Sequence, residues 1–291
     1  MVDPDIKKHL MDNGMDELLA THFAHLFIRD PLVIFAEDLQ EFDRSGSEHF
    51  ENLQSTNWQH MRFKPPPPDS DDVGWRVEFR SMEIQPTDFE NAAFAIFIVL
   101  VTRAILSFDL NFYIPIQRTT ENMQTAHARD ALHMQKFHFR KDPFPIPPQR
   151  QNGQDESSSS GCAASTGPVG SEYRLMTISE IINGSPSPPD GSTPFPGLVP
   201  LVETYLNSIN LDVETMCALA RYLDLISKRA DGTLWTGSKW IRNFVMTHPE
   251  YKHDSIVSER ICYDLVRAIE EMTVKEGRNG SMGWQLLRGK R

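Results

Sequence analysis

The spacing of hydrophobic residues divides the first part of the chain into helical and extended stretches. Over residues 5–28, leucine and phenylalanine recur every three or four positions, which predicts one helix. Asp30-Pro31 ends that pattern, and residues 32–39 are expected to form a second short helix. From residue 57 the period changes to two, which predicts strands over residues 57–64 and 75–85. This part of the chain therefore combines a helical hairpin with extended segments.

Two longer helices are predicted after the strands. The first, over residues 87–107, opens with the capping-box pair Thr87 and Glu90, and its centre is apolar on all sides. We expect it to run through the core for that reason. Its longest apolar run, Ala92–Val101, is far shorter than the ~20 residues that a bilayer requires, so we expect no segment that spans a membrane. The second, over residues 119–139, is richer in polar residues and is expected at the surface.

The rest of the chain divides into three regions. Residues 143–172, rich in proline, serine and glutamine, are expected to be disordered because they bury too little apolar surface. Residues 173–275 are predicted to be wholly helical, with Asp212 and Ser255 as N-caps. The expected helices span Met176–Ile182, Leu198–Ile209, Val213–Ala230, Gly237–Thr247 and Ser255–Lys275. Residues 276–291 are expected to form a flexible tail, and the chain as a whole is predicted to be α+β.

Composition narrows the classes of partner and compartment. The 291 residues carry 29 Lys and Arg against 40 Asp and Glu, a formal net charge of −11, which argues against nucleic acid or an anionic membrane as the main partner. The three cysteines lie far apart without a metal-binding spacing, which favours a reducing compartment. The residues after Met1 do not resemble a signal sequence. We therefore expect a cytoplasmic protein.

The densest group of chemically useful side chains lies on the two predicted strands. Antiparallel pairing would place Glu78, Arg80 and further cations on one sheet face, beside Trp58. A carboxylate is a preferred Mg²⁺ ligand, and the arginine fork fits a carboxylate or a phosphate. The same pattern also fits a solvated sheet face with weak cross-strand ion pairs. The residues alone leave both interpretations open.

Several segments resemble the catalytic subunit of eukaryotic glutamate-cysteine ligases. They occur in order through about residues 5–142 and 172–255. The earlier segments are Ala24–Pro31, His49–Gln59, Met61–Pro68, Gly74–Arg80, Thr87–Asn91 and Phe137–Asp142. The later ones are Ile181–Gly184, Phe195–Leu198 and His248–Lys252. These segments are long and unusual in composition, so coincidence does not account for them.

The resemblance implies a fold and a reaction. The fold would be like that of glutamine synthetase, with residues 1–142 forming part of an antiparallel catalytic sheet domain. In that family ATP phosphorylates the side-chain carboxyl of L-glutamate, and the amine of L-cysteine then displaces phosphate from γ-glutamyl phosphate. The product is γ-glutamylcysteine, in the first step of glutathione biosynthesis. Mg²⁺ is the implied cofactor, and a regulatory (modifier) subunit is an implied partner.

Three residues receive roles from the same resemblance. Glu78 matches a position that is similar to a Mg²⁺ ligand. Arg80 matches a catalytic position that grips the substrate carboxylate or the transferring phosphate, and Trp58 matches part of the cysteine pocket. The resemblance assigns no residue to nucleotide binding.

The resemblance covers only the C-terminal half of the family's length. The other half carries most of the metal-binding carboxylates, and one glutamate with one or two arginines does not hold Mg²⁺ and ATP. We therefore expect this chain to be an incomplete copy that is inactive alone. One alternative is a non-catalytic helical interaction module or regulatory fragment of the same family. Another is a carboxylate-amine ligase with a different amine, against which the similarity to the cysteine ligase argues.

Overall fold

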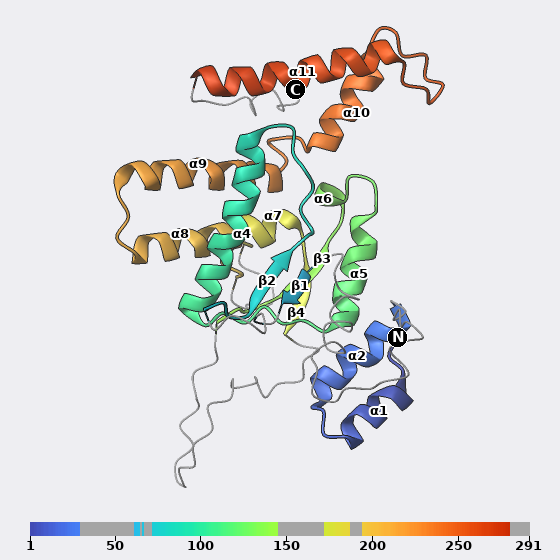
Figure 1. Ribbon diagram of the computed structural model, residues 1–291, viewed down its shortest axis with the longest axis vertical. Coiled ribbons are helices and arrows are strands. Elements are labelled where there is room, and N and C mark those ends of the chain that lie inside the picture. The colour runs from blue at the N-terminus through green and yellow to red at the C-terminus, as the bar shows by residue number, and fades with distance from the viewer. Residues whose placement is uncertain (30–60, 65, 67–71, 145–171, 187–193, 280–291) are drawn as a thin grey trace. The chain divides into compact units, whose positions relative to one another are not determined.

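The computed structural model describes the chain except for residues 30–60, 65, 67–71, 145–171, 187–193 and 280–291. Within the described residues, helices combine with two small antiparallel strand pairs, which confirms the α+β prediction (Figure 1). The chain forms two compact units: unit 1 comprises residues 1–83 and 115–117, and unit 2 comprises residues 84–114 and 118–291. The helix predicted over residues 32–39 and most of the loop predicted over residues 143–172 lie outside the described residues.

The described residues of unit 1 form two helices and one strand pair. These elements are α1 (Pro4–Asp12), α2 (Glu17–Arg29), β1 (Met61–Lys64) and β2 (Arg76–Phe79). The single helix predicted over residues 5–28 is wrong, because the chain turns between α1 and α2. The Asn13 side-chain amide donates to the carbonyl oxygen of His9 at 2.8 Å, and Gly14 follows with φ of +92°. Glycine adopts this left-handed conformation without the steric cost that other residues carry.

The second strand of unit 1 is shorter than the alternation predicts. The described ladder joins residues 61–64 to residues 76–79. Residues 80–85 of the predicted strand over residues 75–85 are not in a strand. Residues 57–60 of the first predicted strand lie outside the described residues.

Unit 2 is built mainly from helices. They are α4 (Asp88–Phe108), α5 (Ile116–Ala126), α6 (Ala131–Met134), α7 (Ile178–Asn183), α8 (Leu198–Ser208), α9 (Val213–Ala230), α10 (Gly237–Thr247) and α11 (Glu259–Asn279). The strands β3 (Phe137–Arg140) and β4 (Tyr173–Met176) pair antiparallel. The predicted helices that correspond to α4, α8, α9 and α10 are confirmed to within one residue at each end. Asp212 caps α9 as predicted, because its Oδ1 accepts from the Thr215 N–H at 2.8 Å.

Two predictions fail where unit 2 forms its strand pair. Residues 119–139 are not one helix: α5 ends at Ala126, and Asp130 adopts a left-handed conformation with φ of 52° before α6. The region over residues 173–275 is not wholly helical, since it begins with β4. The ladder between β3 and β4 buries Phe137 and Met176, and this packing outweighs the local helical pattern.

The last helix also differs from the prediction at both ends. Ser258, not Ser255, stands before the first turn of α11, and its Oγ accepts from the Ile261 N–H at 3.4 Å. Ser255 has a φ of 64° and precedes the helix. The flexible tail predicted over residues 276–291 is wrong for its first four positions, because α11 continues to Asn279.

Helix α4 buries only one face. Its buried residues are Glu90, Ala93, Phe97 and Ala104. On the opposite side, Val99 is 57% exposed and Leu106 is 71% exposed. The expectation that this helix runs through the core with all sides covered is therefore wrong. The helices that pack most closely against it, α8 and α9, cover one side of it.

By length and composition alone, α4 is also the one helix in the described part of the chain that could cross a membrane, with a mean hydropathy of 2.0. The core helices of soluble proteins share these features. The expectation that no segment spans a membrane stays a prediction.

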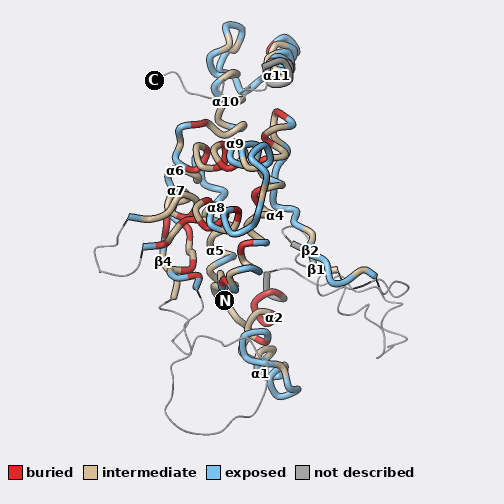
Figure 2. The backbone as a smooth tube through the Cα atoms, turned by 90° about the vertical axis from the view of Figure 1, so that its left-hand side faces the viewer, coloured by how far each residue is buried: buried red, intermediate tan, exposed pale blue. Residues whose placement is uncertain are grey.

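Among the described residues of unit 2, two clusters form the core. The first joins α4, α8 and α9 through Ala93, Phe97, Val199, Val202, Leu206, Leu223, Leu225, Ile226 and Leu234. The second joins the strand pair to α7 and α8 through Leu110, Phe137, Met176, Ile181, Phe195 and Leu201. Exposed and intermediate positions dominate α10, which has no buried residue (Figure 2).

Two glycines allow the chain to pass close to itself between these clusters. Gly184 ends α7 and Gly197 precedes α8, both with positive φ. A Cβ on Gly197 would lie 2.4 Å from the backbone nitrogen of Gly184, a distance that real Cβ atoms do not reach. The Phe195 carbonyl oxygen accepts from the Ser185 N–H at 2.9 Å in the same crossing. Only glycine fits at this crossing, because both space and dihedral angles exclude a side chain.

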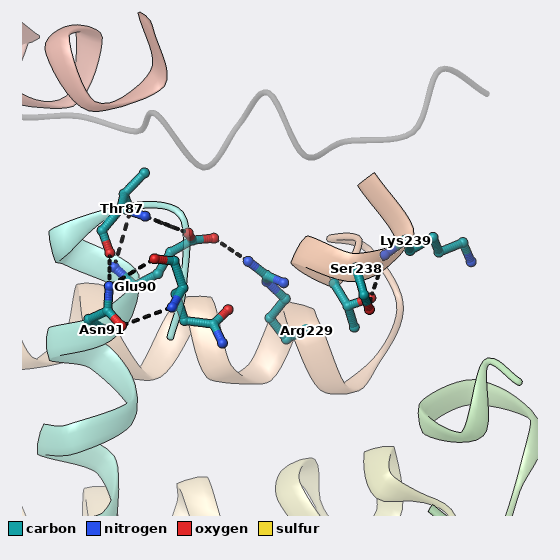
Figure 3. A network of polar contacts seen from close by, with 8 residues as sticks. Thr87, Glu90, Asn91, Arg229, Ser238 and Lys239 are labelled. Carbon is teal, nitrogen blue, oxygen red and sulfur yellow. Dashed lines mark hydrogen bonds and ion pairs between the residues drawn. The ribbon is translucent and has the colours of Figure 1, made fainter. Parts of the chain in front are cut away.

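A buried ion pair joins the start of α4 to the end of α9. Glu90 Oε1 is paired with Nη2 of Arg229, and the two side chains are 0% and 6% exposed (Figure 3). The second carboxylate oxygen, Oε2, accepts from the N–H and hydroxyl of Thr87 at 3.2 and 3.3 Å. Burial lowers the pKa of Arg229, while the Glu90 carboxylate acts in the opposite direction. The capping box predicted at Thr87 and Glu90 is therefore confirmed, and it also holds a tertiary contact.

Asn91 secures the segment that leads into α4. Its side-chain nitrogen donates to the carbonyl oxygens of Gln85 and Thr87 at 3.0 and 2.7 Å. Its side-chain oxygen accepts from the Gln85 N–H at 2.9 Å. The Asn91 side chain, in the first turn of α4, thus satisfies backbone groups of the N-cap Thr87 and of Gln85 before it.

Replacing Arg229 with methionine should destabilise unit 2 strongly. The variant leaves the buried Glu90 carboxylate without its counter-charge, which typically costs ~3–5 kcal/mol. Urea unfolding followed by far-UV circular dichroism measures the loss, and the double variant Glu90→Gln/Arg229→Met should recover most of it. The control is Arg221→Met, an exposed arginine on the same helix. An Arg229→Met loss no larger than that of the control would contradict this role.

Candidate functional site

The candidate site is built on the strand pair of unit 1. β1 and β2 pair antiparallel, with Arg62 opposite Glu78 and Lys64 opposite Arg76. Side chains alternate between the two faces of a strand, so Glu78, Arg76 and Arg80 lie on the same side of the β2 segment. The predicted antiparallel pairing of these segments is therefore confirmed where the strands are described.

Glu78 is the centre of an ionic cluster on this face. Its Oε2 is paired with the Lys64 ammonium, and its Oε1 accepts from Nε of Arg80. About a third of each of the three side chains is exposed to solvent. Lys64 contacts Glu78 diagonally across the ladder, whereas Arg80 is two residues further along the same chain segment. The cluster thus joins one carboxylate to cations from both sides of the strand pair.

The two cations strongly favour the ionised form of Glu78. Hydrogen bonds from Lys64 and then from Arg80 lower the pKa of Glu78 from 4.5 to about 2. The carboxylate is therefore charged throughout the physiological pH range. Because the group is solvated, this shift describes the local charge state and contributes little to stability.

The opposite face of β2 is apolar and open. Trp75, Val77 and Phe79 are 60%, 44% and 42% exposed. The β2 segment thus has one ionic face and one apolar face. An exposed row of aromatic and branched side chains is a surface suited to further packing.

The described residues do not by themselves make a magnesium site. Both carboxylate oxygens of Glu78 are engaged by cations, and no group of three or more His, Cys, Asp or Glu side chains that could hold a metal occurs in the described part of the chain. Mg²⁺ requires several oxygen ligands in octahedral geometry. Glu78 can contribute at most one part of such a site.

Of the three predicted site residues, two come together. Glu78 and Arg80 are in direct contact, as the shared strand face predicts. Trp58 lies outside the described residues, so its predicted place in the cysteine pocket stays a prediction. The sequence predicts further cations on this face, and Lys64 is a cation that contacts Glu78 there. Alternation along one strand shows which side chains lie on the same face. The register between the two strands decides which of them meet, and it brings Lys64 to Glu78.

Removing either cation should raise the pKa of Glu78. We expect both Lys64→Gln and Arg80→Gln to shift it toward 4.5, because each variant removes a hydrogen bond and a positive charge from the carboxylate. The measurement is a pH titration of the Glu78 side-chain carboxyl by carbon-13 NMR, with Arg103→Gln, which changes an exposed arginine of unit 2, as control. Since the folded-state pKa is depressed, the small stabilisation by the cluster exists above about pH 4.5 and is lost as the pH falls toward about 2. A titration midpoint that stays near 2 in both variants would contradict this assignment.

Comparison of the sequence with known proteins identifies the family of the chain. The model of the glutamate-cysteine ligase family matches residues 1–272. The chain is 58% identical to the glutamate–cysteine ligase of Neurospora crassa, over 96% of this chain and 41% of the relative. It is 50% identical to the enzyme of the same name from Schizosaccharomyces pombe, over 94% of this chain and 37% of the relative.

A mammalian relative gives the same result. The chain is 48% identical to the protein named glutamate–cysteine ligase catalytic subunit in Mus musculus, over 91% of this chain and 40% of the relative. The chain thus spans about two-fifths of the length of these relatives. The family match covers unit 1, unit 2 as far as residue 272 and the whole ionic cluster, and the chain belongs to the glutamate-cysteine ligase family.

Proposed function

We propose that this chain forms part of an ATP-dependent ligase that joins the side-chain carboxyl of L-glutamate to the amine of L-cysteine. The product would be γ-glutamylcysteine, made through a γ-glutamyl phosphate in the first step of glutathione biosynthesis. The observation that carries the proposal is the ionised Glu78 held between Lys64 and Arg80, in a chain that is 58% identical to a protein named glutamate–cysteine ligase.

The ionic cluster suits the handling of carboxylate and phosphoryl groups. The guanidinium of Arg80 is a planar group of N–H donors that matches two oxygens of either anion. Glu78 accepts from its Nε and thereby orients the plane of the fork. A cationic group positioned in advance stabilises the negative charge that develops during acyl and phosphoryl transfer. We assign Arg80 to substrate binding and catalysis, and Lys64 to positioning Glu78.

The apolar face of the strand pair supports a larger sheet. In the proposed fold, similar to that of glutamine synthetase, β1 and β2 would belong to a wider antiparallel catalytic sheet. The exposed side chains of Trp75, Val77 and Phe79 would then pack against further elements. Trp58, by resemblance, would form part of the cysteine pocket.

Other proposed components extend beyond the described residues. Glu78 would supply one carboxylate to a Mg²⁺ site, and the further oxygen ligands would come from the part of the family's length that this chain does not span. The mouse relative is named a catalytic subunit, which supports a regulatory subunit as a partner. The three scattered cysteines support a cytoplasmic location.

The alternative function is a non-catalytic helical interaction module. The observation in its favour is that the described residues contain no cluster of metal-binding carboxylates. Activity measurements distinguish the two functions, since a module would add no cysteine-dependent turnover to a completed enzyme.

We expect the 291-residue chain alone to release no ADP in a cysteine-dependent manner when given ATP, glutamate and Mg²⁺. The physical reason is the missing set of oxygen ligands around Glu78. A coupled ADP assay measures this, with the Neurospora crassa enzyme as positive control. Robust turnover by the chain alone would show that it carries a complete site.

In a completed enzyme, Glu78→Gln and Arg80→Lys should each lower kcat/KM by roughly 10²-fold or more. The first removes a charge and keeps the shape, whereas the second keeps the charge and loses the planar fork. The enzyme for this test is the Neurospora crassa relative in which this chain replaces the matching 41%. The melting temperature should change little, because the cluster is solvated.

The control for this experiment is Arg103→Lys, which changes an exposed arginine on α4. It should leave kcat/KM and the melting temperature unchanged. If both site variants keep activity within a factor of about five, which is under ~1 kcal/mol, the ionic face is an ordinary solvated surface and the assignment fails.

A further inference from the structure

A groove in unit 2 combines cationic and apolar side chains. It has a volume of about 690 Å³, which is within the usual range for small-molecule sites. One wall is α10 with the residues before it, and the other is the turn between α5 and α6. The lining residues are Arg129, Asp130, Trp235, Thr236, Ser238, Lys239, Arg242, Asn243 and Met246. All of them belong to unit 2, whereas the ionic cluster around Glu78 belongs to unit 1.

Positive charge is concentrated in this groove, although the chain has a net charge of −11. Three cations, Arg129, Lys239 and Arg242, line it together with a single carboxylate, Asp130. That carboxylate is already engaged, with Nδ1 of His133 at 2.8 Å and Nζ of Lys239 at 3.4 Å. Within the described part of the chain, Arg129 and Arg242 form no ion pair. The groove therefore presents two arginine forks whose charge the fold does not balance.

Apart from the ion pair of Lys239 with Asp130, the cations of the groove repel one another. Lys239 and Arg242 are three residues apart on α10, and like charges at that spacing destabilise a helix slightly. Arg129 extends from the opposite wall toward the same groove. Figure 3 shows the Lys239 side chain extending from α10 away from the buried pair of Glu90 and Arg229. A bound anion would offset the repulsion among the three cations.

The same groove offers a surface for a flat apolar group. Trp235 lies before α10, and its ring centroid is 5.8 Å from Nζ of Lys239. Met246 lines the far end of the same face of α10. Asn243, Thr236 and Ser238 add neutral hydrogen-bonding groups between the charged and apolar parts. An aromatic ring stacked on Trp235 would thus lie in the same groove as the guanidinium groups of Arg129 and Arg242.

We propose that this groove binds a small organic phosphate that carries a planar ring, of which a nucleotide is the general type. The phosphate would be held by Arg129, Lys239 and Arg242, and the ring would lie against Trp235. Arginine forks match phosphate oxygens two at a time, and a tryptophan face accepts any planar ring. The lining residues all belong to unit 2, whereas the ionic cluster of the proposed active site belongs to unit 1, and the proposal is tested without the ligase reaction.

The test uses ADP without metal as the probe and the 291-residue chain as the protein. Titration calorimetry gives the Kd, and the indole N–H signal of Trp235 in a nitrogen-15 NMR spectrum, assigned with Trp235→Phe, reports the location. We expect saturable binding that shifts this signal. Arg129→Gln and Arg242→Gln should each weaken binding at least tenfold, and Arg103→Gln should not change it. Both groove arginines are exposed, so the variants should fold, as circular dichroism will verify.

Two further probes separate the parts of the proposed ligand. Pyrophosphate should bind more weakly than ADP because it lacks the ring, and adenosine should bind more weakly because it lacks the phosphates. The absence of saturable ADP binding at millimolar concentration would overturn the proposal. Binding that leaves the Trp235 signal unmoved or survives both arginine variants would overturn it too. So would occupation of the groove by a polyglutamate peptide but not by ADP, which would identify the groove as a peptide site.

Discussion

The buried ion pair between Glu90 and Arg229 is the constraint on which the arrangement of unit 2 depends. Both side chains are almost completely removed from solvent, so each charge requires the other. The pair therefore fixes the start of α4 against the end of α9, and the first apolar cluster packs along the same two helices and α8. Removing two charges from water is costly, and the capping contacts with Thr87 help to satisfy the carboxylate.

The ion pairs around Glu78 have a different physical character. They involve the same types of group, but about a third of each side chain is in contact with solvent. Solvation weakens their contribution to stability and leaves the groups accessible to ligands. Charged groups thus occur in two environments in this chain. The buried pair holds two helices of the core together, and the exposed cluster is accessible to ligands.

The segments that resemble the glutamate-cysteine ligase family have identifiable structural functions. Thr87–Asn91 caps α4, supplies the buried carboxylate and secures the preceding segment. Gly184 and Gly197, from two other such segments, allow two stretches of backbone to cross at a distance that excludes a side chain. Much of the resemblance in unit 2 is therefore explained by folding, whereas that in Gly74–Arg80 is tied to the ionic cluster.

Local patterns in the sequence determined a large part of this fold. Capping residues and helical periodicity located α4, α8, α9 and α10, because these signals depend on residues within one or two turns. Period-two alternation placed Glu78 and Arg80 on one face, because successive side chains of a strand point to opposite sides. The same reasoning failed where pairing partners are distant, as for β3 and β4.

Only the tertiary structure decided which polar groups meet. Arg229 lies 139 residues from Glu90, and no local pattern links them. The register of β1 and β2 brought Lys64 to Glu78, and the approach of α10 to the turn before α6 brought Asp130 to Lys239. The sequence by itself determined the elements and their faces, because these depend on near neighbours along the chain. The structure decided the contacts between elements, because packing and desolvation act between residues that are distant in sequence and close in space.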